Sequence, residues 1–442
     1  MNKEKRSKET AKLLFTIINV VLFTALFFIM LYFIYPNVNY KLNGYAIVII
    51  IYFVFLVVFG QMFDMYNLGD TRVYDLFLSY SLGLLVSNIM IFLVICLASF
   101  RFMPLIPILI FQFISEFIIA FLLLFENRFI RDHFPIPKAI AVFGEPNYEI
   151  LEKIYKYRDI LVTVEKRVDT KDIDFNNLDE LLDGYERVIT IDVDHNEKKE
   201  IFKKCYENKI SVYDIPSISD TLIATSQVLH VIDTPILKIN RFGPSYLESI
   251  TKRAIDILGS LFLIVLTSPI MIVTAIAIKL HDGGDIFFRQ TRLTKDGKEF
   301  KIIKFRSMIM NAESKTGAVL AKEHDDRITP VGRFIRKTRF DELPQLFNIL
   351  KGDMTFVGPR PERPELFNEI CKEIPEFKYR LNVKAGLTGY AQIYGKYNTS
   401  MRDKLLLDLY YIESYSLIAD VKLLVMTIKI VFVPESTEGV KE

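Results

Sequence analysis

The chain has 442 residues, which is long for one ordinary core, so we expect two or more structural units. Hydrophobic residues make up 51% of it, a share that points to a membrane protein and argues against a wholly soluble one. The net charge is only +2 because acidic and basic residues balance, which argues against a bulk nucleic-acid-binding protein. Cys96, Cys205 and Cys371 lie far apart, so neither a disulfide framework nor a cysteine metal site is expected.

Four uncharged or nearly uncharged runs open the chain, at residues 13–35, 42–63, 76–100 and 102–125. At about 22–25 residues, each can cross a hydrocarbon core of roughly 30 Å as a helix. The first run has no cleavage site of small residues, so we expect it to be retained. Glu116 lies inside the fourth run, and we expect it to contact another helix, although a functional role is an alternative.

Membrane topology follows from the basic residues. They are dense in the first twelve positions and sparse in the short loops between the runs. This favours a cytoplasmic N-terminus, and four crossings then return the chain to the cytoplasm.

A fifth apolar run, residues 257–278, is interrupted by Ser268 and Pro269 and has basic residues on both flanks. A crossing would place one basic flank outside, against the positive-inside tendency. A helix bent at Ser268-Pro269 can instead enter and leave on the same face, provided that side chains bind the carbonyls freed by the proline. We expect this re-entrant hairpin, with a kinked span as the alternative.

Residues 136–245 are expected to form a cytoplasmic, Rossmann-like α/β domain after the membrane bundle at 1–135. Apolar strands are predicted at 139–144, 160–165, 186–191 and 210–213, and helices at 148–157 and 197–208. Strands that alternate with helices indicate a parallel sheet. The single Gly144 after the first strand is no dinucleotide fingerprint, so packing, oligomerisation or regulation is the expected role.

The remaining residues, 246–442, are dense in paired charges and Gly/Pro turns and are expected to form an α+β domain associated with the membrane. A strand predicted at 300–308 places Lys304 and Arg306 on one face, where they bind phosphates or are simply solvated. Asp341 and Glu342 follow a basic stretch that ends at Arg339. One acid can attack or coordinate while the other holds a divalent cation such as Mg²⁺; an acidic pair at a helix start is the alternative.

Two further turns can bind anions. Gly and Pro residues in segment 351–363 present Arg360 and Arg363 rigidly, and arginine binds phosphate oxygens bidentately. Segment 383–392 carries Lys384, and its glycines, Gly386 and Gly389, permit a close backbone approach to an anion. Basic turns around an acidic pair, beside a membrane hairpin, suit two phosphate-bearing substrates, one soluble and one lipid.

Residues 252–442 resemble the catalytic domain of the bacterial sugar transferases, the monotopic phosphoglycosyl transferases. The resemblance rests on KRAIDILGS, the Ser268-Pro269 break, KFRSM, RFDELPQLFNILKGDMTFVGPRPERPE, KAGLTGYAQIYGK and DLYYIE, in that order. The four N-terminal helices and the α/β domain resemble the long members of the family, the polyprenyl-phosphate hexose-1-phosphate transferases that start capsule or exopolysaccharide repeat units.

The resemblance implies transfer of a sugar-1-phosphate from a UDP-sugar to polyprenyl (undecaprenyl) phosphate, with release of UMP. It implies Asp341 as the nucleophile that forms a phosphosugar-aspartyl intermediate, and Glu342 as a ligand of Mg²⁺. Lys304 and Arg360 match positions that contact phosphates. Lys396 falls where relatives often carry arginine, and Gln392 and Asp408 are auxiliary candidates.

The same resemblance implies a multi-pass protein of the bacterial cytoplasmic membrane, with its catalytic domain on the cytoplasmic face. Homo-oligomers and polysaccharide-assembly proteins are expected partners, and no nucleic acid is. Glucose or galactose is the favoured sugar, and an N-acetylated or dideoxy sugar stays open. The apolar segments 405–411 and 417–432 are expected to lie at the membrane interface.

Two other functions compete with this one. A membrane-bound nucleotide-sugar dehydratase would need a dinucleotide fingerprint and a Tyr-x-x-x-Lys pair, and neither Tyr379 nor Tyr390 has a lysine four residues later. An inactive scaffold would not need the acidic pair and its basic turns.

Overall fold

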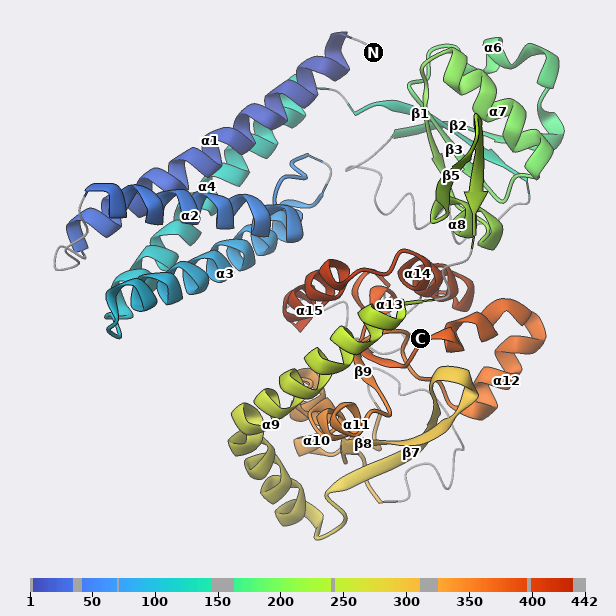
Figure 1. Cartoon of the computed structure of the whole chain (residues 1–442). Coiled ribbons are helices and arrows are strands. Elements are labelled where there is room, and N and C mark those ends of the chain that lie inside the picture. Colours follow the sequence, from blue (N-terminus) through green and yellow to red (C-terminus); the bar gives the residue numbers. More distant parts are fainter. Residues whose placement is uncertain are drawn as a thin grey trace. The chain divides into compact units, whose positions relative to one another are not determined.

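The computed structural model describes residues 3–34, 42–69, 71–134, 136–144, 163–239, 243–310, 325–395 and 399–431. The chain divides into two compact units, Met1–Ile215 and Pro216–Glu442, and Figure 1 traces the elements of each.

The first unit begins with four long apolar helices: α1 (Lys3–Ile34), α2 (Leu42–Met62), α3 (Val73–Ser99) and α4 (Ile106–His133). Helices α2 and α3, α3 and α4, and α1 with both α2 and α4 pack together. All four are long and apolar enough to cross a membrane. Their outer faces expose large apolar side chains such as Phe33, Leu97 and Phe121, which a lipid environment would cover. The predicted apolar bundle is therefore confirmed.

Polar side chains inside this bundle join one helix to another. Glu116 on α4 accepts hydrogen bonds from Ser81 of α3, at 2.8 Å, and from Gln112, at 2.5 Å. Nearer the other end, Asn19 of α1 donates to Tyr80 of α3 and to Glu126 of α4. In a membrane, an apolar side chain gains little by leaving lipid for another helix, so hydrogen bonds between helices help to hold them together. The predicted helix contact of Glu116 is confirmed.

A four-stranded parallel sheet follows, built from β1 (Lys138–Phe143), β2 (Thr163–Asp169), β3 (Arg187–Ile191) and β4 (Ser211–Asp214) in the order β2-β1-β3-β4. Helices α6 (Leu178–Leu182) and α7 (His195–Glu207), with short 3₁₀ turns at Thr170–Asp172 and Phe175–Asn177, belong to it, and residues of α6 and α7 share a core with Ile140 and Val188. The predicted parallel sheet is confirmed, whereas the helix predicted at 148–157 and the start of the strand predicted at 160–165 lie outside the described residues.

The second unit opens with α8 (Ile218–Ala224) and the hairpin of β5 (Gln227–Val231) and β6 (Thr234–Lys238). The 37-residue helix α9 (Tyr246–Asp282) comes next, followed by the antiparallel pair β7 (Phe287–Leu293) and β8 (Glu299–Phe305), joined by a 3₁₀ turn at Lys295–Gly297. The described elements that follow are, in chain order, α10 (Pro330–Lys337), η4 (Phe340–Glu342), α11 (Gln345–Lys351), β9 (Thr355–Val357), α12 (Pro364–Glu373), η5 (Pro375–Asn382), β10 (Gly386–Thr388), α13 (Tyr390–Ile393), α14 (Met401–Glu413) and α15 (Leu417–Val431).

Helix α9 contains the Ser268-Pro269 pair and bends along its length in Figure 1. Pro269 has no N–H to donate to the carbonyl of Val265, four residues earlier. The hydroxyl of Ser268 donates to that same carbonyl at 2.8 Å, and the hydroxyl of Thr267 donates to Leu263 O at 2.7 Å. The carbonyl that Pro269 leaves without its helical donor thus has a side-chain partner, as a proline break inside a membrane requires. The helix is long and apolar enough to cross a membrane.

The N-terminal half of α9 is fastened to the core of the second unit. Arg253 donates to Ile349 O and Leu350 O, at 2.7 Å each, and so caps the end of α11. Asp256 accepts from the backbone N–H of Phe356 and the hydroxyl of Thr355, at 3.0 Å each.

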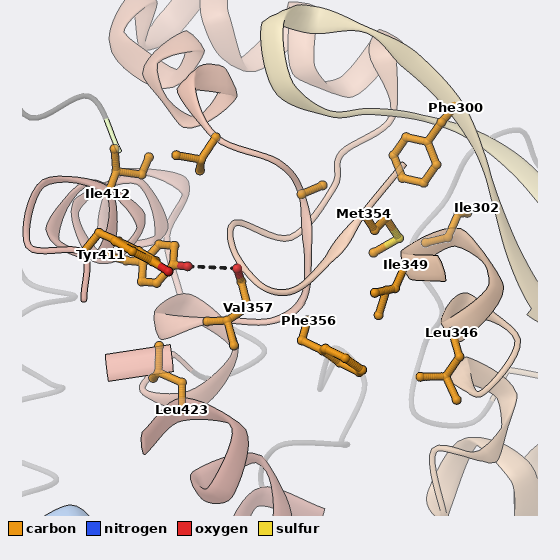
Figure 2. Close-up of a cluster of buried hydrophobic side chains, with 13 residues drawn as sticks. Phe300, Ile302, Leu346, Ile349, Met354, Phe356, Val357, Tyr411, Ile412 and Leu423 are labelled. Carbon is orange, nitrogen blue, oxygen red and sulfur yellow. Dashed lines mark hydrogen bonds between the residues drawn. The ribbon is translucent and has the colours of Figure 1, made fainter. Parts of the chain in front are cut away.

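The core beside these contacts gathers side chains from β8, α11, β9, α14 and α15. Figure 2 shows Phe300, Ile349, Phe356 and Leu423 around this cluster, with the hydroxyl of Tyr411 donating to Val357 O at 2.9 Å. The strand predicted at 300–308 is shorter than expected and ends at Phe305, because its partner β7 begins opposite that residue, at Phe287.

Candidate active site

The acidic pair lies in the 3₁₀ turn η4, directly after a left-handed residue. Arg339 has a φ of 57°, which ends the helical path of α10. Phe340 and Leu343 then pack on a small core that contains Met271 of α9 and Phe305 of β8. These two apolar anchors lie on either side of Asp341 and Glu342 in the chain, so the turn presents both acids at the edge of the core.

Glu342 is surrounded by cations from three segments. Its Oε1 lies 2.9 Å from Nζ of Lys304 on β8 and 3.2 Å from Nη2 of Arg360. Its Oε2 lies 3.9 Å from Nη1 of Arg339. Burial acts in the opposite direction, but these cations hold the pKa of Glu342 well below its usual range. Glu342 is therefore ionised, and it orients Lys304 and Arg360.

Asp341 has different surroundings. Among the described residues, none forms an ion pair or hydrogen bond with its carboxylate. Burial, and after it the negative charge of Glu342, raises the pKa of Asp341 to about 6, while Lys304, Arg336 and Arg360 act in the opposite direction. At neutral pH most of the carboxylate is ionised, and no side chain in the described part of the chain uses its lone pairs. A carboxylate in this state can act as a nucleophile at an electron-poor centre.

Arg360 comes from the Pro-rich loop between β9 and α12. Its side chain is 46% exposed and reaches Glu342, so part of the guanidinium is open to a ligand. Arg363 is the N-cap residue of α12. The structure thus brings Lys304, Arg339 and Arg360 together around the acidic pair, as the charge pattern predicted.

Arg306, in contrast, is directed elsewhere. It follows the end of β8, and its guanidinium is bound by Asp282 at the end of α9 and by Asp285 O at 2.6 Å. The prediction that Lys304 and Arg306 share one strand face is wrong, because the strand stops before Arg306.

Lys384 is half-buried just before β10. Burial, and then the nearby charge of Arg253, lowers its pKa. Its charged neighbours include Arg253, Lys295 and Asp353, a group separate from those around Asp341 and Glu342.

Gly386 and Gly389 allow a close approach of another backbone segment, whereas the sequence predicted the close approach of an anion. A Cβ on Gly386 would lie 2.1 Å from Gly358 N, and one on Gly389 would lie 2.3 Å from Gly358 O. The space beside these glycines is filled by the backbone of the Arg360 loop. The glycines are therefore needed to pack two loops together, and this corrects the expectation that they approach an anion.

The auxiliary candidates have structural partners. Nε2 of Gln392 lies 3.5 Å from Gly358 O, while its Oε1 is buried with no hydrogen-bond partner among the described residues. Asp408 on α14 accepts a hydrogen bond from Nε of Arg380 at 2.6 Å. Lys396 lies outside the described residues. Sequence reasoning did not single out Arg380, which lies in a short 3₁₀ segment with no motif of its own.

The donor set bears on the expected Mg²⁺. No group of three or more His, Cys, Asp or Glu side chains gathers among the described residues. Mg²⁺ at phosphate sites is commonly held by one or two carboxylates together with substrate oxygens and water. Asp341 and Glu342 offer two adjacent carboxylates, so the residues present fit that mode of binding.

Comparison with known proteins identifies the family. A family model described as bacterial sugar transferase matches residues 247–434. A protein of Bacillus subtilis named uncharacterized sugar transferase EpsL is 40% identical over 189 residues, which cover 43% of this chain and 91% of that protein. The chain belongs to the bacterial sugar transferase family.

Two further members of the family are also similar to this chain. One, named UDP-N-acetylgalactosamine-undecaprenyl-phosphate N-acetylgalactosaminephosphotransferase, from Aeromonas hydrophila, is 41% identical over 229 residues, 51% of this chain and 53% of that protein. The UDP-glucose:undecaprenyl-phosphate glucose-1-phosphate transferase of Escherichia coli is 34% identical over 235 residues, 52% of this chain and 50% of that protein. The chain thus spans about half the length of these relatives. The family match runs from α9 to α15 and includes every residue around Asp341.

Proposed function

We propose that this sugar transferase moves a sugar-1-phosphate from a UDP-sugar to undecaprenyl phosphate and releases UMP. The observation that carries the proposal is the division between the two acids. The carboxylate of Glu342 forms ion pairs with Lys304 and Arg360. The carboxylate of Asp341, beside them, forms none with the described residues. The names of the relatives from Aeromonas hydrophila and Escherichia coli describe reactions of this class.

In the first step, a carboxylate oxygen of Asp341 attacks the phosphorus that carries the sugar. A bond forms between that oxygen and phosphorus, the bond between phosphorus and the oxygen of UMP breaks, and UMP leaves with the electron pair. The product is a phosphosugar linked to Asp341 as an acyl phosphate. Lys304 and Arg360 offset the negative charge on the phosphoryl oxygens during this step.

In the second step, a phosphate oxygen of undecaprenyl phosphate attacks the same phosphorus. The bond to Asp341 breaks, the carboxylate is restored, and undecaprenyl-diphosphate-sugar is formed. One carboxylate thereby serves two successive displacements, and the two phosphate substrates need not be bound at the same time.

A divalent cation fits this chemistry. Glu342 would hold Mg²⁺ next to the phosphates of the donor, with Asp341 adjacent to it. When bound, Mg²⁺ supplies neutralisation of charge on the phosphoryl oxygens.

The membrane topology belongs to the same proposal. We infer that α9 enters and leaves the bilayer on one face, bent at Ser268-Pro269, because both of its flanks are basic. The four N-terminal helices then return the chain to the cytoplasmic face of the inner membrane, where UDP-sugars are found. A prenyl chain cannot leave the bilayer, so a membrane hairpin beside the site would bring the enzyme to the lipid phosphate.

Labelling of the intermediate tests the function. The purified full-length chain is mixed with UDP-sugars radiolabelled in the sugar (glucose, galactose and N-acetylgalactosamine), without lipid acceptor, then quenched and digested. We expect label on the peptide that contains Asp341, and UMP release that becomes continuous when undecaprenyl phosphate is added. Asp341→Asn should lower turnover by about 10³-fold or more while the protein still inserts into membranes. Label on a different peptide, or near-normal turnover of Asp341→Asn, would contradict the mechanism.

A further inference from the structure

The loop that carries Arg360 is held in place through its backbone carbonyl groups. Two of its residues, Pro359 and Pro361, lack an N–H, so the loop can donate few hydrogen bonds of its own. Five successive carbonyls, from Gly358 to Glu362, instead accept from other segments. In that order, the donors are Gln392 Nε2 at 3.5 Å, Gly386 N at 2.9 Å, Arg380 Nη2 at 3.0 Å, Arg292 Nη1 at 3.1 Å and Leu293 N at 3.0 Å.

The carbonyl of Arg360 itself is bound by Arg380, and Arg380 is oriented by Asp408. Nε of Arg380 donates to Oδ2 of Asp408 at 2.6 Å, and the two side chains are only 4% and 1% exposed. The guanidinium also lies 4.5 Å from the centre of the Phe377 ring, which is fully buried. A planar guanidinium bound by a carboxylate on one edge and an aromatic ring on one face has a single orientation, and that orientation directs Nη2 at Arg360 O.

The backbone and the side-chain tip of Arg360 are held by different partners. Its side chain is 46% exposed and its tip contacts Glu342, while its backbone is fixed by a buried charge. Asp408 is on α14 and Arg380 is in η5, so two elements far from the acidic pair in sequence hold the backbone carbonyl of Arg360 itself. Burial of an ion pair costs desolvation energy and adds little net stability, so stability alone is a weak reason for such a pair.

We propose that Asp408 and Arg380 are positioning residues for Arg360: they hold the backbone from which its guanidinium reaches the phosphates of the donor. The inference rests on the proposed function, since it assumes that Arg360 contacts a phosphate. Asp408 then acts through Arg380 and Arg360 without touching substrate.

The test is a double-mutant cycle on the full-length chain in lipid nanodiscs, with the UDP-sugar that supports the fastest UMP release. Asp408→Asn removes the charge that orients Arg380, and Arg380→Lys keeps the charge but lacks the planar fork whose Nε and Nη2 reach Asp408 and Arg360 O. Each is made in the native background and in Arg360→Lys, which keeps a positive charge and hence a measurable rate. In the native background we expect kcat/KM to fall roughly 10- to 100-fold, because a small misplacement of a binding group is costly. In the Arg360→Lys background the further loss should be no more than about threefold.

A matched control separates positioning from stability. Asp214→Asn removes another partly buried pair, with Lys198 at 2.6 Å, in the unit that does not contain Arg360. It should lower the thermal unfolding midpoint without changing kcat/KM. Equal losses from Asp408→Asn in both backgrounds, or full activity of Asp408→Asn and Arg380→Lys, would overturn the inference. A wild-type chain that releases no UMP from any UDP-sugar would instead contradict the proposed function, and this is measured before any variant.

Discussion

Asp341 and Glu342 are neighbours in the chain, yet their carboxylates have opposite titration behaviour. Glu342 lies within hydrogen-bonding distance of Lys304 and Arg360, which stabilise its charge. Asp341 is half-buried next to that charge, and partial burial together with the charge of Glu342 raises its pKa to about 6. Two acids whose surroundings separate their pKa values can take different roles in one reaction. In the mechanism we propose, Glu342 compensates charge and Asp341 attacks phosphorus.

The pKa of Asp341 leads to a prediction about pH. Only the ionised carboxylate can attack phosphorus, and the protonated fraction grows as pH falls through about 6. We expect kcat/KM for UMP release to be constant at neutral pH and to fall about tenfold per pH unit well below 6. Two variants should shift this acidic limb in opposite directions. Glu342→Gln removes a negative neighbour and should move it to lower pH, whereas Lys304→Gln removes a positive one and should move it to higher pH. A limb that does not move in either variant would argue against Asp341 as the titrating group.

Removal of divalent cations gives a second prediction at this scale. If Glu342 holds Mg²⁺ beside the donor phosphates, excess EDTA should abolish UMP release, and added Mg²⁺ should restore it. Glu342→Gln should raise the Mg²⁺ concentration needed for half-maximal activity by roughly tenfold or more, since one ligand loses its charge. Full activity in EDTA would remove Mg²⁺ from the mechanism.

Helix α9 is the element that connects the membrane to the site. Lys252 pairs with Asp420 of α15, Arg253 caps α11, and Asp256 binds the backbone of β9. These charges lie within two turns, so the start of α9 is fixed to the large core of the second unit. Further along, Met271 and Ile278 pack with Phe305, and Phe340 of η4 lies against the same cluster. The site therefore keeps a set position relative to this long apolar helix.

The prediction for α9 concerns the effect of Pro269 on its path through the membrane. In a cysteine-free background, Ser249→Cys places a single cysteine near the start of α9, and Lys298→Cys places one after its end, in the turn between β7 and β8. If the helix is re-entrant, a membrane-impermeant reagent applied to inverted vesicles should label both. Pro269→Ala restores an N–H for Val265 O and should straighten the helix, so that one of the two positions loses labelling and UMP release falls. Unchanged labelling and unchanged activity in Pro269→Ala would show that the proline does not set the bend.

At the scale of the whole molecule, the family match and the site lie in the same unit. Residues 247–434 match the family, and the second compact unit begins at Pro216. The relative from Bacillus subtilis is covered over 91% of its length by a match of only 189 residues. A chain of this kind can therefore consist of little more than the matched region.

The corresponding prediction concerns truncation. Residues 216–442, reconstituted in nanodiscs, should fold and release UMP within about tenfold of the full-length rate, because unit boundaries tend to fall where few contacts cross. The same fragment with Asp341→Asn is the control and should be inactive. If the fragment is well folded by circular dichroism but inactive, the first unit takes part in the reaction.

Several features followed directly from residue patterns. The four apolar runs became α1 to α4, and the apolar strands paired in parallel, because hydropathy and periodicity are local properties. The serine and proline at 268 and 269 marked the middle of α9, since a missing N–H acts on a carbonyl only four residues away. Lys304, Arg339 and Arg360 were predicted from their charge, from local strand and turn patterns and from the family resemblance, and each lies within ion-pair distance of Glu342.

Other features depended on contacts between distant parts of the chain. Arg306 looked equivalent to Lys304 by alternation, but Asp282, 24 residues away, captures it where the strand ends. Gly386 and Gly389 resembled an anion-binding turn, yet they face the backbone of Gly358. The pair of Arg380 and Asp408 has no sequence signature, because the two residues are distant in sequence and meet only in the folded chain. The sequence alone thus determined which residues could carry the chemistry, while the tertiary structure decided which of them meet, since a contact depends on the path of the whole chain.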